Sequence, residues 1–350
     1  MITTSDVNGW YQEWIPPVEA SGARPRWSVM IPTYHCAIYL RSTLESVLSQ
    51  DPGSDAMQID VVDDCSTLDD PRAVVEEIGR GRVTFFRQPR NVGHVANFNT
   101  CLRRSRGDLV HILHGDDCVA PGFYATMQRI FDDHPEIGAA FCQHIVMDEA
   151  GHWIALAELE AHAGGPIADW LERIATGPRL QPPAMVVRRS VYEALGGFDR
   201  RITAYGEDWE MWVRIASRYT VWYEPTALAL YRVRTHSLAR QSTRTGANMH
   251  DMATVIDIIQ GYVPLALRSD VVHTARTVGA LGALRRAHRL LGAGDRLATF
   301  AQAREAVRFS RSPEVLLRAG YLSLRLVTSW FRPLARWVGM SSRADKPGWR

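Results

Sequence analysis

Adjacent carboxylates at positions 116 and 117 are the side chains of this sequence whose type and spacing point most directly to chemistry. Asp116 and Asp117 come shortly after residues 109–113, an apolar run with the pattern of a buried strand. Neighbouring carboxylates repel each other unless a cation or a network of donors offsets their charge. A divalent metal held by so few protein oxygens takes further ligands from a phosphate. The pair therefore predicts a metal–phosphate site; the alternative is a polar turn in which Asp116 caps the next helix.

Strand and helix patterns alternate along the part of the chain that must position these carboxylates. Short apolar runs predict strands, and apolar residues at helical spacing predict the helices between them. We expect strands at residues 27–31, 59–62, 83–86, 109–113, 139–142, 185–187, 221–223 and 228–231. We expect helices at residues 38–50, 71–79, 94–106, 121–134, 190–197 and 207–219. This alternation predicts an α/β fold with a doubly wound, mostly parallel sheet and helices on both faces.

The pattern divides the chain into three parts. Residues 1–25 form a lead-in that prolines and a glycine interrupt. Residues 26–240 carry the α/β pattern, and within them residues 148–181 are less regular and indicate an insertion. Residues 241–350 are rich in Ala, Leu and Arg at helical spacing, which predicts a helical C-terminal extension.

Charge is distributed unevenly along the chain. The net charge is +2, but residues 271–350 carry 15 Arg and Lys against 4 Asp and Glu, which leaves +11. Residues 1–270 therefore carry −9. An acidic body with a basic tail is not the pattern of a nucleic-acid-binding core, and we expect no nucleic-acid partner.

Cysteine usage and the absence of long apolar runs bear on location. The five cysteines are odd in number and lack paired metal-ligand spacing, which indicates a reducing compartment and no structural zinc. The first residues lack the apolar segment of a secretory signal. No apolar run reaches the about 18 residues that a spanning helix needs. We expect a cytoplasmic protein, with peripheral contact at the cytoplasmic membrane face as an option.

Four motifs, in this order, resemble those of the family 2 glycosyltransferases, which have the GT-A fold. They lie at residues 29–34, 61–67, 114–117 with Pro121 behind, and 196–199 followed by 206–210, and residues 91–93 with Asn97 also match. Together the motifs span about 26–240. The resemblance implies a metal-dependent, inverting transferase of the hexosyltransferase type, in polysaccharide or cell-envelope biosynthesis. It would move a sugar from a nucleoside diphosphate sugar to a hydroxyl of a glycan or lipid-linked saccharide.

The same resemblance assigns donor binding to side chains near the ends of the first strands. These are Pro32, Thr33, Tyr34, Asp63, Asp64, Asn91, Gly93, Asn97, Asp116 and Arg234. An ionised carboxylate only accepts hydrogen bonds, so beside a backbone N–H it can read the base edge that uracil and thymine share. This favours Asp64 over Asp63, and UDP or dTDP as the nucleotide. The alternative is that both aspartates cap the turn that follows.

The implied metal is Mg²⁺ or Mn²⁺, held by Asp116 and Asp117 and bridging the diphosphate. The metal would stabilise the charge that gathers on the leaving group. The family usually has Asp where His114 stands, and His114 either shapes the pocket or joins the metal site. A later family histidine is replaced by Arg234. Either Arg234 binds the diphosphate as a fixed cation, or His236 reaches the metal.

Asp208 is the candidate general base, with Glu207 as the second candidate or as its orienting partner. A sugar hydroxyl is a poor nucleophile at neutral pH and needs a carboxylate within hydrogen-bond reach. A single base opposite the diphosphate implies in-line displacement with inversion. The alternative is ordinary acidic residues in the first turn of a helix, where the dipole favours them. Trp209 and Trp212 either stack on an acceptor sugar or pack in the core.

The basic tail leaves more than one role open. Residues 314–340 combine Arg with Leu, Trp and Phe at helical spacing, and Pro333 is expected to kink or end that helix. Such a helix suits peripheral membrane contact, or packing and homodimer formation.

Two alternative functions remain. One is a degenerate, non-catalytic subunit that binds glycans or acts as a scaffold. His114 and the missing family histidine favour this alternative, although Asp116, Asp117 and Asp208 are intact. A nucleotidyltransferase is less favoured, because residues 31–36 lack the glycine of a triphosphate-binding loop.

Overall fold

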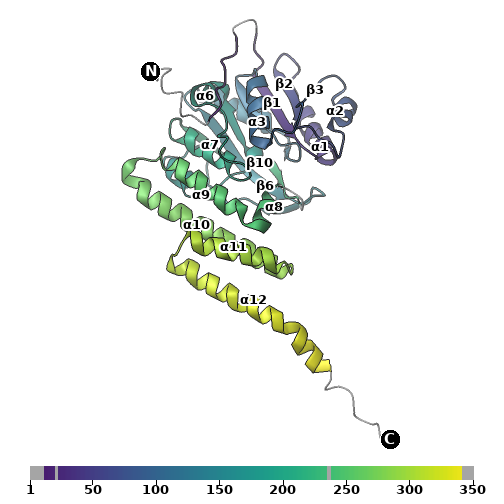
Figure 1. The fold of residues 1–350 in the computed structure, drawn as a ribbon. Helices are drawn as coiled ribbons and strands as arrows, with labels where there is room; N and C mark the ends of the chain where they lie inside the picture. Colours follow the sequence, from purple (N-terminus) through teal and green to yellow (C-terminus); the bar gives the residue numbers. More distant parts are fainter. Residues whose placement is uncertain (1–11, 20–22, 235–237, 341–350) are drawn as a thin grey trace, which may run out of the picture.

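A mixed sheet with helices on both faces forms the larger part of the molecule, and a run of helices extends from it (Figure 1). The computed structural model describes residues 12–19, 23–234 and 238–340. The main path of the sheet runs β3 (Thr84–Arg87), β2 (Met57–Asp63), β1 (Trp27–Thr33), β4 (Leu109–Ile112), β9 (Met185–Arg188), β6 (Ala139–Met147), β10 (Val221–Arg232) and β5 (Cys118–Val119). Off this path, β7 (Trp153–Leu156) pairs with β6, and β8 (Gly165–Pro166) pairs with β10.

Strand direction brings the candidate site to one edge of this sheet. Strands β3, β2, β1 and β4 are parallel neighbours, and β6 runs parallel to β10. Strand β9 lies antiparallel between β4 and β6. The predicted α/β fold with a largely parallel sheet is confirmed. Because β1, β2 and β4 run the same way, their carboxyl ends meet where α/β sheets bind ligands.

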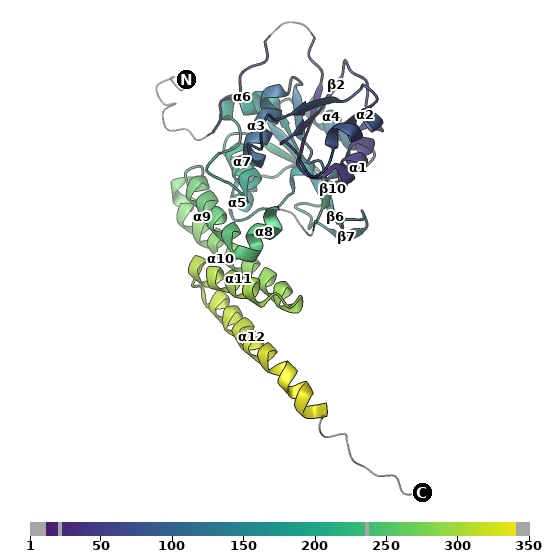
Figure 2. The ribbon, with the colours of Figure 1, turned by 45° about the vertical axis from the view of Figure 1, so that its right-hand side comes forward.

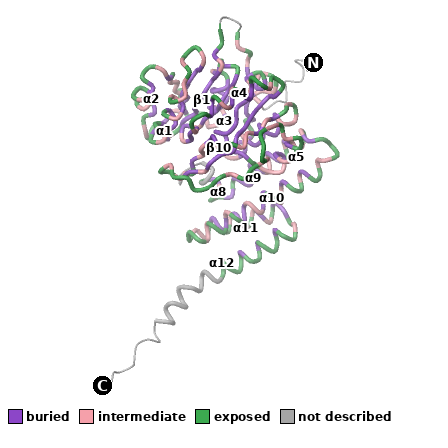
Figure 3. The backbone as a smooth tube through the Cα atoms, turned by 180° about the vertical axis from the view of Figure 1, so that it is seen from behind, coloured by how far each residue is buried: buried purple, intermediate pink, exposed green. Residues whose placement is uncertain are grey.

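Two buried clusters of apolar side chains cover the two faces of the sheet. One contains side chains of α1 (Ala37–Leu48), α2 (Pro71–Gly79) and α4 (Phe123–Asp133). The other contains side chains of α3 (His94–Arg104), α5 (Trp170–Ala175), α6 (Arg189–Leu195) and α7 (Glu207–Ala216). Neighbouring strand residues face opposite ways, so Met30 joins one cluster and Ile31 the other. Figure 3 shows this buried interior as purple tube along the strands.

Some strands differ from the expected pattern. The runs 221–223 and 228–231 belong to one strand, β10, whose pairing with β6 shifts register between Glu224 and Ala229. Strand β6 extends to Met147, beyond the expected end at residue 142. The irregular stretch 148–181 contains β7, whose four residues are all exposed.

The C-terminal part is helical, as expected. Its helices are α8 (Leu238–Thr245), α9 (Ala247–Ile259), α10 (Leu265–Gly292), α11 (Arg296–Phe309) and α12 (Pro313–Met340). Helix α9 packs against α7 of the α/β body and against α8, whereas α12 projects away from that body (Figures 1 and 2). Helix α12 continues through Pro333, so the expectation that the helix could end there is wrong. Among the described helices, none combines the length and apolar character needed to span a bilayer.

Candidate active site

The end of β1 ties together the two acidic loops that follow β2 and β4. The carbonyl of Thr33 accepts from the Asp64 N–H at 2.9 Å, and that of Pro32 accepts from the Gly115 N–H at 3.0 Å. A Cβ on Gly115 would lie 2.9 Å from Thr33 Oγ1. Only glycine therefore lets the 114–117 turn approach β1 this closely.

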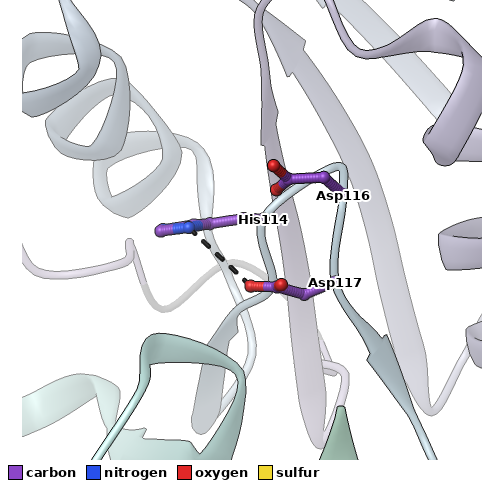
Figure 4. A group of neighbouring side chains, drawn as sticks. All are labelled: His114, Asp116 and Asp117. Atoms are coloured by element: carbon purple, nitrogen blue, oxygen red, sulfur yellow. Dashed lines mark ion pairs between the residues drawn. The ribbon is translucent and has the colours of Figure 1, made fainter. Parts of the chain in front are cut away.

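His114, Asp116 and Asp117 form a compact group on that turn (Figure 4). One ligand atom from each lies within 4.8 Å of the others. Asp117 is buried; one of its oxygens accepts from the Arg232 N–H at 2.8 Å, and the other has no hydrogen-bond partner among the described residues. Burial, together with the charge of Asp116, raises the pKa of Asp117. A buried carboxylate oxygen without a donor fits a bound divalent cation, which offsets this penalty.

His114 has the character of a neutral ligand. Burial lowers the pKa of His114, so its imidazole carries a free nitrogen lone pair near neutral pH. The ring stacks on Phe98, with the centroids 4.9 Å apart and the planes at 23°. Its Nδ1 lies 3.9 Å from the unpaired Oδ2 of Asp117. His114 therefore adds a neutral nitrogen donor to the two carboxylates of the group.

Arg232, at the end of β10, braces the acidic turn and was not predicted from the sequence. Its Nε donates to the Asp116 carbonyl at 2.8 Å, and its Nη1 donates to the carbonyls of Asp148 and Glu149. The guanidinium lies over the Tyr39 ring, 5.0 Å from the centroid. Arg232 thus joins the turn to α1 and to the loop before β7.

We call His114, Asp116 and Asp117 the metal-ligand group. Arg234 lies beside this group, as the sequence motif suggested it could. Its Nε is 2.5 Å from Asp116 Oδ2, an ion pair that places a fixed cation at the rim of the group. His236, the other candidate from this segment, lies outside the described residues.

Asp64, Asn91 and Gly93 come together as a second group at the same edge. The two carboxylate oxygens of Asp64 accept from the N–H groups of Val92 at 2.7 Å and Gly93 at 3.0 Å. The Asn91 Nδ2 donates to the Asp64 carbonyl at 3.3 Å. Burial raises the pKa of Asp64, although the two N–H donors oppose this. The carboxylate is thereby fixed in orientation, with one lone pair left on each oxygen.

Asp63 and Asn97 lie behind this group. Asp63 is fully buried, and its oxygens accept from the Ser66 N–H and hydroxyl and from Arg87 Nε at 2.7 Å. This is the turn-capping arrangement named above as the alternative for the two aspartates. Asn97 is also buried, and its Nδ2 donates to the Val62 carbonyl at 2.8 Å. Both side chains hold the end of β2 in place.

The three residues at the end of β1 differ in what they present. Pro32 and Thr33 are buried, and Thr33 Oγ1 contacts Cys36 Sγ at 2.8 Å. Tyr34 is exposed, and its ring stacks on His35 with the centroids 3.8 Å apart. Tyr34 is therefore the residue of the three whose side chain can meet a ligand.

Glu207 and Asp208 begin α7 directly after Gly206, whose φ of +92° is one that glycine adopts without strain. Asp208 Oδ1 accepts from the Trp209 N–H at 2.7 Å. Burial, reinforced by the charge of Glu207, raises the pKa of Asp208 to about 7. A carboxylate with a pKa near neutrality is suited to general base catalysis.

Glu207 is ionised and paired with His94, a residue that sequence reasoning missed. His94 Nε2 lies 3.4 Å from Glu207 Oε1. Burial opposes the ionisation of Glu207, but the charge and hydrogen bond of His94 outweigh it and lower the pKa of Glu207. His94 opens α3 directly after the matched residues 91–93, which is the signal that could have identified it.

Aromatic side chains connect the candidate base to the metal-ligand group. Phe98 makes an edge contact with His94, with centroids 5.6 Å apart, and stacks on His114 at its other side. Burial raises the pKa of Tyr231, and the charges of Asp117, Asp116 and Asp208 add to this rise. The hydroxyl of Tyr231 therefore lies within electrostatic range of all three carboxylates.

Trp209 and Trp212 belong to the core rather than to an acceptor platform. Both are buried, and the Trp209 Nε1 donates to the Ile174 carbonyl at 2.6 Å. The stacking alternative for these two side chains is therefore wrong.

Comparisons with known proteins agree with this arrangement. The model of the family "Glycosyl transferase family 2" matches residues 28–196. An uncharacterized protein of Mycobacterium tuberculosis is 30% identical over 269 residues, which cover 72% of this chain and 82% of that protein.

Two solved structures resemble the fold. S. aureus TarS 1-349 in complex with UDP-GlcNAc matches with a TM-score of 0.51 and 16% identity, over 81% of this chain and 91% of that one. The mannosyltransferase PcManGT from Pyrobaculum calidifontis, in complex with GDP-Man and Mn²⁺, matches with a TM-score of 0.54 and 20% identity, over 95% of this chain and 88% of that one. With the family match, this GT-A architecture and the acidic groups at the edge of its sheet, the chain belongs to glycosyltransferase family 2.

Proposed function

We propose that this chain is a metal-dependent, inverting glycosyltransferase that moves a hexosyl group from a nucleoside diphosphate sugar to a hydroxyl of a glycan or lipid-linked saccharide. One observation carries the proposal. Asp208, with its pKa raised to about 7, follows Glu207, which contacts His94, and Phe98 joins His94 to His114 of the metal-ligand group. A base and a diphosphate site on two sides of one space are what displacement at an anomeric carbon requires.

In this proposal Asp116, Asp117 and His114 hold Mg²⁺ or Mn²⁺. The bound metal supplies positive charge that stabilises the leaving diphosphate. Arg232 keeps the turn in position through the Asp116 carbonyl and the Asp117 carboxylate. Arg234 pairs with Asp116 here and is the fixed cation that we expect to engage a diphosphate oxygen.

The nucleoside is assigned to the group around Asp64. Its carboxylate is oriented by the N–H groups of Val92 and Gly93, and exposed Tyr34 lies after the neighbouring strand. A carboxylate acceptor fixed in this way suits the N3–H donor of uracil or thymine. This supports UDP or dTDP as the nucleotide. The two solved relatives hold UDP-GlcNAc and GDP-Man, so the fold accepts more than one base.

Asp208 is the proposed base. It takes the proton of the acceptor hydroxyl as the oxygen attacks the anomeric carbon, on the side opposite the diphosphate, and this inverts the configuration. Glu207 does not compete for that proton, because it is held ionised by His94. Its negative charge instead keeps the pKa of Asp208 high, which makes Asp208 a stronger base.

The pH dependence of transfer follows from this pair. The rate is expected to rise with pH through about 7, because Asp208 must lose its proton to act as a base. Glu207→Gln removes the neighbouring negative charge and should move this rise to lower pH. Exposed Glu136 offers a control, since Glu136→Gln removes the same charge outside the site. Initial rates across pH check this, and an unshifted profile in Glu207→Gln would contradict the coupling.

The proposed activity is tested with a panel of UDP-, dTDP- and GDP-sugars. Each is incubated with the protein, Mn²⁺ and a membrane extract as the source of acceptors, and released nucleoside diphosphate is measured. Release from one donor, abolished by a chelator, is the expected result. Donor binding without release from any sugar would instead favour a non-catalytic, glycan-binding subunit.

The C-terminal helices are proposed to contact either a membrane face or a second copy of the chain. On α12 the side chains of Leu317, Tyr321 and Leu324 are exposed, which supports an external partner for this helix. The side chains beyond residue 327 lie outside the described ones.

A further inference from the structure

A groove between α10 and α12, far along the chain from the motifs of the active site, is lined by arginines. Its volume is about 730 Å³. Arg285, Arg286 and Arg289 come from α10, and Arg318 comes from α12. Between them the groove has apolar lining, including Leu284 and Tyr321. The combination of guanidinium groups and apolar surface distinguishes the groove from a purely apolar contact between helices.

The three arginines of α10 that line the groove lack acidic partners among the described residues. Among the described residues, no carboxylate forms an ion pair with Arg285, Arg286 or Arg289, whereas Arg318 pairs with Glu314 at 2.8 Å. Burial lowers the pKa of Arg286, and the charges of Arg289 and Arg285 lower it further. Like charges that repel each other without a counter-charge favour binding of an anion.

One side of the groove continues into an exposed apolar row on α12. Leu317, Tyr321 and Leu324 lie at i, i+4 and i+7 and are 76%, 58% and 62% exposed. Tyr321 belongs both to this row and to the lining of the groove. A cationic groove is therefore joined through Tyr321 to a row of exposed apolar side chains.

We propose that this groove binds the phosphate headgroup of an anionic lipid while the apolar row of α12 lies in the membrane interface. Guanidinium groups bind phosphate oxygens in a fork geometry that suits such a headgroup. Basic segments with exposed apolar residues are drawn to anionic membrane surfaces. A second copy of the chain is a poorer occupant, because it would bring another basic face, from a tail that carries +11, against this one.

Arg286 and Tyr205 influence each other electrostatically, and Tyr205 in turn responds to Asp208 and Glu207. The proposal stands without the transfer reaction, since it concerns binding alone.

The test is co-sedimentation of the full-length protein with phosphatidylcholine vesicles that contain or lack phosphatidylglycerol. Binding is expected only to the anionic vesicles and should weaken as salt is raised. Arg285→Gln with Arg289→Gln should weaken it about 30-fold, from the usual contribution of two basic residues near an anionic surface. As a control, Arg304→Gln with Arg308→Gln on α11 removes the same charge from exposed positions outside the groove. Vesicle binding by this control should change by less than about fivefold, which is the contribution of one basic residue.

Other readouts separate this proposal from its competitors. UDP binding with Mn²⁺ should be the same in both double variants, so loss of vesicle binding is distinguishable from loss of the active site. Leu317→Ser with Leu324→Ser should also weaken vesicle binding at an unchanged melting temperature. The proposal is overturned if full-length protein ignores anionic vesicles, or if both arginine pairs have equal effects. It is also overturned if inorganic phosphate alone stabilises the protein through Arg285 and Arg289 without vesicle binding, or if these residues control dimer formation instead.

Discussion

Asp208→Asn is expected to lower the rate of sugar transfer by a factor of about 10² to 10⁴, the usual contribution of a general base. The carboxamide keeps the shape of the side chain, and its oxygen can still accept from the Trp209 N–H that begins α7. It cannot take a proton from the acceptor hydroxyl. The turnover number and the calorimetric affinity for the donor should therefore separate, with the first lost and the second retained.

Two comparisons make this result interpretable. The melting temperature of Asp208→Asn should not fall, because the variant removes a buried carboxylate whose charged form is disfavoured. Glu207→Gln should retain far more activity than Asp208→Asn, since Glu207 acts through the pKa of its neighbour. Near-normal turnover in Asp208→Asn, with a large loss in Glu207→Gln, would show that the two roles are reversed.

Asp117→Asn should lower the affinity for the donor in the presence of Mn²⁺ on the order of 100-fold. Loss of a metal ligand should cost at least as much affinity as loss of a residue that only supports a ligand. The oxygen that accepts from the Arg232 N–H can be kept in the carboxamide, so the turn retains its brace. In the unmodified protein the other oxygen, Oδ2, is buried without a hydrogen-bond partner among the described residues. In the variant an NH₂ group takes its place, and this group cannot bind a cation. Titration calorimetry with and without a chelator measures the effect.

The matched control for this prediction is Asp133→Asn at the exposed end of α4, which removes an equal charge outside the site. The control should bind donor as the unmodified protein does. Unchanged affinity in Asp117→Asn would mean that Asp117 does not hold the metal and that its free oxygen serves another purpose.

Elements with strong local signals were predictable from the sequence. Helix α2 has the predicted bounds, because Asp70 caps its start by accepting from the N–H groups of Arg72 and Ala73, and Pro71 occupies its first turn. Strand β5 was not predicted, since two residues show no periodicity and form a strand only through pairing with β10. The single long β10 was missed for the same reason, because its continuity across Glu224 and Ala229 depends on β6.

The candidate site shows the same division between local and distant signals. The motifs supplied Asp116, Asp117, Asp208 and Asp64, and the fold gathers them at one edge of the sheet. No motif indicated that His94 meets Glu207, because α3 and α7 approach each other only in the folded chain.

Side-chain direction was equally hidden from the sequence. Asp63 and Asn97 match the family pattern as well as Asp64 does, yet both face inward and brace the end of β2. The bracing role of Arg232 depends in the same way on where β10 ends in the folded protein.

The central claim is that the group of His114, Asp116 and Asp117 binds a nucleoside diphosphate through a divalent cation. Its most direct test is calorimetric titration of the unmodified protein with UDP, dTDP and GDP, each with Mn²⁺ and with a chelator. We expect one nucleotide, UDP or dTDP, to bind with Mn²⁺ and to lose most of its affinity when the metal is removed. Equal affinity with and without metal, or no binding of any nucleotide to the folded protein, would contradict it.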